Sequence, residues 1–125
     1  MNVRTASTLI ASVATLLCGC ATTHDKYDWG SYDHSLYVYY KDPATAGDLL
    51  QGLDALIKNA DSTKAVVPPG IYAEYGYLLL QQGKSKEAVG AFQQEETRWP
   101  ESKVFMDRMI QVASSRTATT STQEP

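Results

Sequence analysis

Apolar side chains recur at helical spacing through most of the chain beyond residue 30. From Ala46 to Ile57 they follow an i, i+3, i+4, i+7 pattern, which is typical of an amphipathic helix with one buried face. The next stretch is apolar on most sides, which indicates burial between neighbouring helices. Prolines and glycines separate these patterns and predict where helices begin and end. The predicted helices after residue 40 are Pro43–Asn59, with Asp42 as its cap, then Ile71–Gly83, Lys84–Trp99 and Ser102–Ala113.

The segment 27–40 is rich in aromatic residues and allows two interpretations. Tyr32, Leu36 and Tyr39 recur at helical spacing, with Ser31 placed to cap the first amides of a helix. The run from Tyr37 to Tyr40 also suits a β-strand, because aromatic and β-branched residues favour sheets. No other segment offers a strand to pair with, so a helix is favoured. The expected fold is therefore all-α, a small helical bundle or short solenoid of four to five helices.

The first twenty residues are typical of a targeting signal rather than of a folded element. One positive charge, on Arg4, precedes an uncharged apolar stretch that is too short to span a bilayer as a helix. The stretch ends in Leu17-Cys18-Gly19-Cys20, which resembles the bacterial lipobox. That resemblance implies cleavage before Cys20 and attachment of lipid to it, and several acyl chains hold a protein stably on a membrane. A plain secretory signal is the alternative.

The residues after Cys20 bear on the destination and on the organisation of the chain. In enterobacterial-type sorting, Asp directly after the lipidated Cys retains a lipoprotein in the inner membrane. Ala21 and Thr22 follow here, so an outer-membrane anchor is expected, with the domain facing the periplasm. The predicted organisation is a signal peptide over 1–19, a lipidated tether over 20–26, a helical domain over 27–113, and a disordered Ser/Thr-rich tail over 114–125.

Residues 69–102 resemble a single tetratricopeptide unit, in which two antiparallel helices touch closely. The family pattern is W-x₂-L-G-x₂-Y, then A-x₃-F, then P. The matching positions here are Tyr72-x₂-Tyr75-Gly76-x₂-Leu79, then Ala88-x₃-Phe92, then Pro100, with Glu95 where the family usually has a small Ala. One unit cannot bury its own faces. The predicted helices Pro43–Asn59 and Ser102–Ala113 are therefore expected to cover its two sides, and the tyrosine-rich helix is expected to pair with Pro43–Asn59.

The layout beyond Cys20 also resembles a family of small Gram-negative lipoproteins known as domain-of-unknown-function 4810. The residues that carry this resemblance are Tyr27-x-Trp29-Gly30-x-Tyr32, then Leu36-Tyr37-x-Tyr39-Tyr40, Pro43 and Trp99-Pro100. Members of that family tend to be encoded beside a CsgG-like secretion lipoprotein and another small lipoprotein. The resemblance implies a cell-envelope complex and assigns no activity.

Two sets of residues are candidates for binding a protein partner. The first lies on the face of the repeat that tetratricopeptide arrays use as a concave groove, with Tyr77 and Leu80 as apolar anchors and Gln81 and Lys84 polar at the rim. The alternative is that Tyr77 and Leu80 pack on the preceding helix, and this is favoured for Leu80. The second set is Trp29 and Tyr32, either as a docking patch near the membrane or, preferably, as part of the core.

Catalysis and metal binding are not expected. His24 and His34 are too far apart in sequence for the closed ligand spacing of a zinc site, and Glu95 and Glu96 are interpreted as a solvated helix face. The 125 residues carry a net charge of −3 without a basic stripe, which argues against nucleic acid as a partner. No cofactor is predicted. The expected function is that of a non-catalytic adaptor or assembly factor in an envelope complex, and the alternative is a regulator of a periplasmic enzyme such as a peptidoglycan synthase.

Overall fold

The computed structural model describes residues 26–121, with side chains described as far as Arg116. Within that range the chain is all-helical, with five α-helices and no strand, as the apolar spacing predicts. The predicted signal peptide 1–19, Cys20, most of the tether and residues 122–125 lie outside the described residues. The α-helices are α2 (Tyr32–Lys41), α3 (Ala46–Thr63), α4 (Ile71–Gln81), α5 (Ser85–Arg98) and α6 (Lys103–Ser121), and the short 3₁₀ helices are η2 (Pro43–Thr45) and η3 (Pro100–Ser102).

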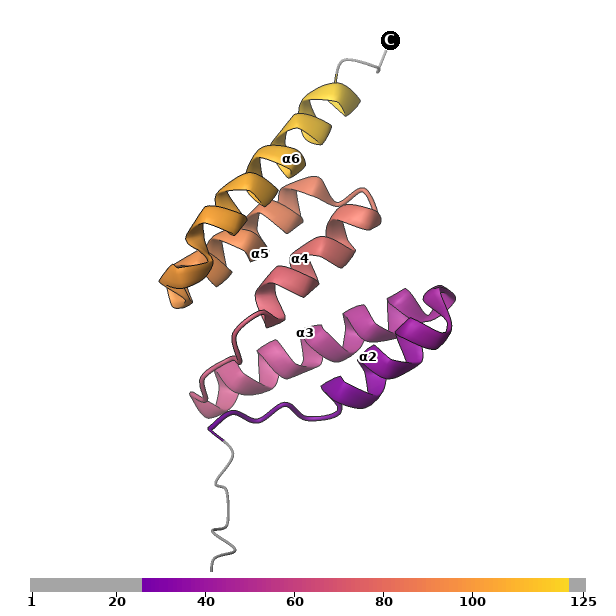
Figure 1. Ribbon diagram of the computed structural model, residues 1–125, viewed down its shortest axis with the longest axis vertical. Helices are drawn as coiled ribbons and strands as arrows, with labels where there is room; N and C mark the ends of the chain where they lie inside the picture. Colours follow the sequence, from indigo (N-terminus) through magenta and orange to yellow (C-terminus); the bar gives the residue numbers. More distant parts are fainter. Residues whose placement is uncertain (1–25, 122–125) are drawn as a thin grey trace, which may run out of the picture.

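Each α-helix packs on the next one along the chain (Figure 1). Helices α2 and α3 form one antiparallel pair, and α4, α5 and α6 stack beside it. Two clusters of buried apolar side chains hold these layers together, one between α3 and α4, and one among α4, α5 and α6. Helix α4 contributes to both clusters, which explains why its sequence is apolar on most sides.

Several helix ends differ from the prediction. Asp42 caps the turn at Pro43 as expected, with its carboxylate accepting a hydrogen bond from the Ala44 amide at 3.0 Å. Ser31 occupies the cap position of α2, but its side chain makes no capping hydrogen bond. Helix α3 continues to Thr63, where Lys64 adopts a left-handed conformation with φ 58°. Helix α6 runs to Ser121, past the predicted end at Ala113 and into the segment expected to form a disordered tail.

Helices α4 and α5 approach each other closely at Gly76. A Cβ atom built on Gly76 would lie 2.7 Å from Cε1 and 2.9 Å from Cδ1 of Phe92. Phe92 is fully buried, and Ala88, one turn before it on the same helix, is fully buried as well. The missing side chain of Gly76 therefore makes the space that the Phe92 ring fills.

Glu95 departs most clearly from its prediction as part of a solvated helix face. Its side chain is only 2% exposed, and its Oε1 accepts a hydrogen bond from the Gly70 amide at 2.7 Å. Gly70 is the cap residue of α4, with φ 89°, and has no side chain of its own to satisfy the first amides of the helix. Burial raises the pKa of Glu95, and hydrogen bonds from backbone amides at the start of α4 oppose that rise. Glu95 thus acts as the cap of α4 from a position on α5.

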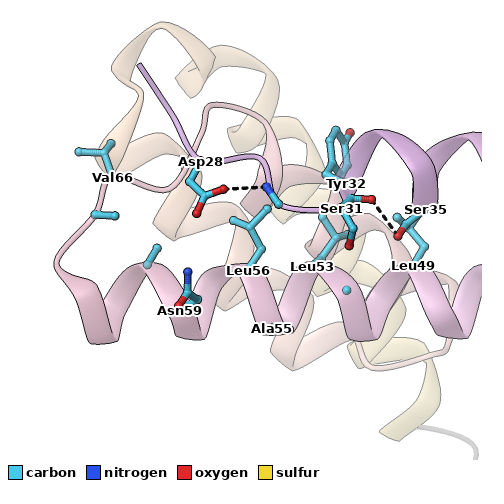
Figure 2. A pocket seen from close by; sticks show the side chains of 14 residues that line it. Asp28, Ser31, Tyr32, Ser35, Leu49, Leu53, Ala55, Leu56, Asn59 and Val66 are labelled. Atoms are coloured by element: carbon cyan, nitrogen blue, oxygen red, sulfur yellow. Dashed lines mark hydrogen bonds between the residues drawn. The ribbon is translucent and has the colours of Figure 1, made fainter. Parts of the chain in front are cut away.

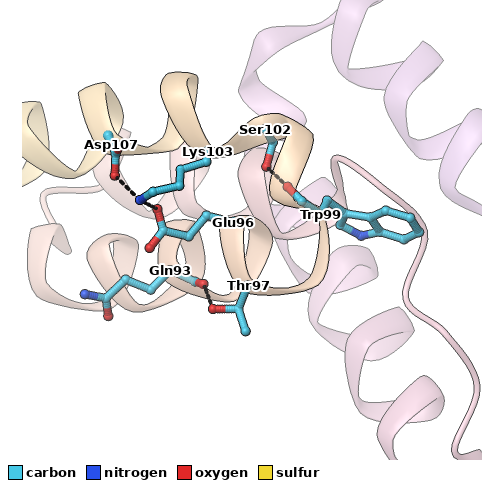
Figure 3. Close-up of polar contacts among 7 residues, drawn as sticks. All are labelled: Gln93, Glu96, Thr97, Trp99, Ser102, Lys103 and Asp107. Atoms are coloured by element: carbon cyan, nitrogen blue, oxygen red, sulfur yellow. Dashed lines mark hydrogen bonds and ion pairs between the residues drawn. The ribbon is translucent and has the colours of Figure 1, made fainter.

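The connection between α5 and α6 is held by short-range polar contacts (Figure 3). The Ser102 hydroxyl donates to the Trp99 carbonyl at 2.7 Å, at the start of η3. The Lys103 ammonium lies 3.0 Å from Asp107 Oδ1 and 3.6 Å from Glu96 Oε2, which links the two helices. The Trp99 side chain points away from these contacts toward the first half of the chain (Figure 3).

Candidate partner-binding site

An apolar groove lies between α4 and α6. Both helices pack on α5, and the contact between α4 and α6 themselves is slight. The groove has a volume of about 280 Å³. Its lining residues come from all three helices and from the residue before α4: Gly70, Ala73, Glu74, Tyr77, Phe92, Phe105, Met106 and Met109.

The walls of the groove differ from its floor in exposure. Phe92 is fully buried and Met106 is 1% exposed, so these two side chains belong to the core beneath the groove. Tyr77 on α4 is 47% exposed, and Phe105 on α6 is 61% exposed. Two large side chains on different helices thus present apolar surface at one hollow, which is the arrangement expected of a binding site for an apolar segment.

The sequence prediction located one wall of this groove and missed the other. Tyr77 lies in the groove. Gln81, the last residue of α4, and Lys84, the cap residue of α5, are exposed and do not line it. Leu80 is 4% exposed, so it is unavailable as an anchor. It belongs to the buried cluster of α4, α5 and α6, against which Leu50 of the preceding helix also packs. Phe105 and Met109 were not singled out, although their spacing by one helical turn places them on one face.

Trp29 and Tyr32 lie in an aromatic cluster where the chain enters the domain. Their rings stack with centroids 5.7 Å apart, and Tyr27 contacts Trp29 edge-on at 6.2 Å. Tyr27 also meets the ring of Trp99 edge-on at 5.8 Å, which joins the entering segment to the end of α5. Both Trp29 and Tyr32 are half-buried and pack against the core cluster between α3 and α4.

Tyr32 also makes a polar contact across the fold. Its hydroxyl donates a hydrogen bond to a carboxylate oxygen of Glu74, which ties the start of α2 to α4. Burial, and then the hydrogen bond and negative charge of Glu74, raise the pKa of the Tyr32 hydroxyl, which therefore keeps its proton at neutral pH. Glu74 lines the groove, so this bond occupies the one carboxylate found there.

A second cavity of about 230 Å³ lies between the entering segment, the start of α2 and α3 (Figure 2). Leu49, Leu53 and Leu56 supply much of its apolar side. Two of the polar side chains drawn there bond within the chain: the Asp28 carboxylate accepts from the Gly30 amide at 2.9 Å, and the Ser35 hydroxyl donates to the Ser31 carbonyl at 3.2 Å. These two side chains therefore have less hydrogen-bonding capacity left for a ligand in this cavity.

Neither a cluster of metal-ligating residues nor a membrane-spanning helix is found among the residues that the structure describes. Among residues 26–121, no group of three or more His, Cys, Asp and Glu residues is placed to hold a metal ion. Over the same residues, no helix combines the length and the apolar character needed to cross a membrane.

One comparison with known proteins gave a match. A family model described as a domain of unknown function, DUF4810, matches residues 26–109, which takes in the entering segment, α2 to α5 and the start of α6. No curated protein and no solved structure matches the chain.

Proposed function

Because the chain belongs to the DUF4810 family, we propose that it is an outer-membrane-anchored lipoprotein that serves as a non-catalytic adaptor or assembly factor in a cell-envelope complex. The family resemblance adds a CsgG-like secretion lipoprotein as a neighbour in that complex. Lipid on Cys20 holds the domain at the membrane, facing the periplasm. The domain binds an apolar segment of a partner protein in the groove between α4 and α6.

The observation that carries the proposal is the pair of exposed aromatic side chains at the groove. Burying an aromatic side chain in an interface contributes more than burying most other side chains, and such residues dominate many binding sites. Tyr77 and Phe105 lie beside a floor that is already apolar, so apolar side chains of a partner bind favourably there when they leave water. A membrane anchor adds to this, because it raises the effective concentration of any partner at the same surface.

A tetratricopeptide-like packing of α4 and α5 supports the same proposal. Gly76 and Phe92 occupy the positions at which that family's pattern has its Gly and its Phe, and the Phe92 ring fills the space where a side chain on Gly76 would lie. In such units the first helices of successive repeats line the ligand groove. Helix α6 follows α5 as the first helix of another unit would, and with α4 it lines the groove observed here.

Photo-crosslinking in cells tests whether the groove binds a protein. A photoreactive amino acid placed at Tyr77 should give an adduct with a defined envelope protein, and the same group at Tyr40, which is 79% exposed on α2, should not. Equal adducts at both positions, or none at Tyr77, would argue against a groove partner.

Two neighbouring residues on α6 supply matched variants for this experiment. Phe105→Ser removes a groove residue, whereas Val104→Ser removes a neighbouring apolar side chain that is even more exposed and does not line the groove. The adduct at Tyr77 should weaken in the first variant and persist in the second. If both variants behave alike, the contact does not depend on the groove.

A further inference from the structure

One edge of the domain gathers apolar side chains around the point where the chain enters. The segment from Lys26 runs beside the C-terminal end of α3 and the start of the loop before α4 (Figure 1). Its Tyr27 ring also contacts Trp99, which follows the end of α5. We define the entry edge as Lys26, Tyr27, Trp29, Val66 and Trp99. Val66 is 57% exposed, although its neighbour Val67 is fully buried, and it lies near Asp28 at the rim of the second cavity (Figure 2).

Both tryptophans of the protein belong to this edge. Trp29 and Trp99 are joined through the Tyr27 ring, which contacts each of them edge-on. All three aromatic side chains are half-buried, with the Trp99 ring nitrogen itself buried, and the Lys26 ammonium lies 5.1 Å from the centre of the Tyr27 ring. Trp and Tyr are enriched at the boundary between membrane and water, where a neighbouring Lys can extend its charge into the headgroup region.

The length of the tether restricts how far this edge can lie from an anchored Cys20. From Cys20 to Tyr27 the chain advances by seven residues. A fully extended chain spans at most about 3.6 Å per residue, so Tyr27 lies within about 25 Å of the lipidated residue. That reach is about twice the radius of gyration of a chain of 100 residues, which is about 13 Å. The tether therefore leaves the domain some freedom to turn, but it keeps the entry edge within about 25 Å of an anchored Cys20, whereas the far end of α2 can lie farther away.

We propose that the entry edge rests on the headgroup region of the bilayer that holds the anchor, with Tyr27, Trp29 and Trp99 at the boundary between headgroups and acyl chains. The proposal depends on lipidation of Cys20 in the proposed function. We infer that phospholipid covers this edge, because the tether brings the entry edge, and not the far end of α2, near the membrane surface.

This orientation also places the partner groove. Phe105 follows Trp99 closely in the chain, across the short η3, whereas Lys84 lies at the other end of α4. The end of the groove formed by Gly70 and Phe105 therefore faces the bilayer, and the end near Lys84 points toward the periplasm. A partner segment in the groove is then bound close to the membrane surface.

Tryptophan fluorescence of the lipidated full-length protein tests the contact. The processed protein is purified from membranes and reconstituted into vesicles of phosphatidylethanolamine and phosphatidylglycerol. In half of the samples the lipid carries bromine on the acyl carbons nearest the glycerol. Because the chain has two tryptophans, Trp29→Phe and Trp99→Phe each leave a single reporter at the entry edge. We expect bromine to lower the emission of both variants.

A reporter far from the edge supplies the control. In the double Phe variant, Tyr40→Trp places the only tryptophan near the end of α2, at a side chain that is 79% exposed. Its emission should be the same with and without bromine. Quenching at Tyr40→Trp equal to that at the edge would overturn the proposal, because the edge would then have no special contact with the bilayer.

Flotation of the same samples separates the possible failures. If the protein floats with the vesicles and neither edge tryptophan is quenched, the entry edge does not touch the membrane, while the anchor stands. If the protein does not float and Cys20 carries no lipid by mass spectrometry, the anchor of the proposed function fails and the edge contact fails with it. If the protein floats with the vesicles and only the edge tryptophans are quenched, the result supports both the lipid anchor and the contact of the entry edge with the bilayer.

Discussion

Replacing Gly76 by alanine tests the close contact between α4 and α5 most directly. The added Cβ would lie 2.7 Å from Cε1, 2.9 Å from Cδ1 and 3.1 Å from Cζ of Phe92. Carbon atoms are at their best separation at about 3.5–4.0 Å, so the ring or the helix has to move. Phe92 is fully buried and is surrounded by core residues, which leaves its ring little room.

Two opposing effects decide the size of the change. Inserting a methyl group into a well-packed core costs about 1–3 kcal/mol, whereas alanine in place of glycine stabilises a helix interior by roughly 0.5–1 kcal/mol. Gly90→Ala is the matched control, since Gly90 lies inside α5 and a Cβ there would meet nothing within 4 Å. Both variants gain the same helix stabilisation from replacing glycine by alanine. Their free energies of unfolding should therefore differ only by the cost of crowding Phe92, about 1–3 kcal/mol. For a domain of this size each 1 kcal/mol corresponds to about 4–8 °C in Tm.

Urea unfolding followed by circular dichroism measures this difference, because the helical signal reports the whole domain. Gly76→Ala should be less stable than Gly90→Ala, with an unchanged dependence on urea concentration. Adding Phe92→Leu to Gly76→Ala should cost less than Phe92→Leu costs alone, since the smaller side chain relieves the crowding. If Gly76→Ala proves as stable as Gly90→Ala, the ring does not sit over Gly76 and the packing described for α4 and α5 is wrong.

Two further predictions concern Cys20 and Glu95. Cys20→Ser should accumulate as a precursor without lipid label in cells, whereas Cys18→Ser should be processed normally; lipid labelling of the Cys20 variant would refute the anchor. Because burial raises the pKa of Glu95 in the folded state, the folded protein binds more protons than the unfolded chain between the two pKa values, and its free energy of unfolding falls as pH rises through that range. Glu95→Gln removes this titration, so urea unfolding between about pH 4 and pH 7 should show a smaller loss of stability with rising pH than in the unmodified protein. Equal pH dependence in the two would contradict the raised pKa of Glu95 in the folded state.

Local patterns in the sequence predict the helices well and their ends less well. Apolar spacing and the positions of proline and glycine predict all five helices, because each helix must bury one stripe of side chains. The extension of α6 to Ser121 was missed, since its last part has no apolar stripe to indicate a helix. The burial of Glu95 was missed for a different reason. Its spacing places it on the same buried face of α5 as Ala88, Ala91 and Phe92. The amide that its carboxylate caps, however, belongs to the start of α4, and the position of that helix end relative to α5 cannot be read from the spacing.

The groove could be predicted only in part, because its two walls come from segments that are far apart in sequence. Single exposed apolar residues are common on protein surfaces and carry little meaning. Helix α6 illustrates this, since Val104 and Phe105 are both exposed and only Phe105 lines the groove. What distinguishes Phe105 is its position near Tyr77 on a different helix, above a buried ring. The pairing across helices, and not the exposure of either residue alone, is why the variant at Phe105 should lose the partner while the variant at Val104 retains it.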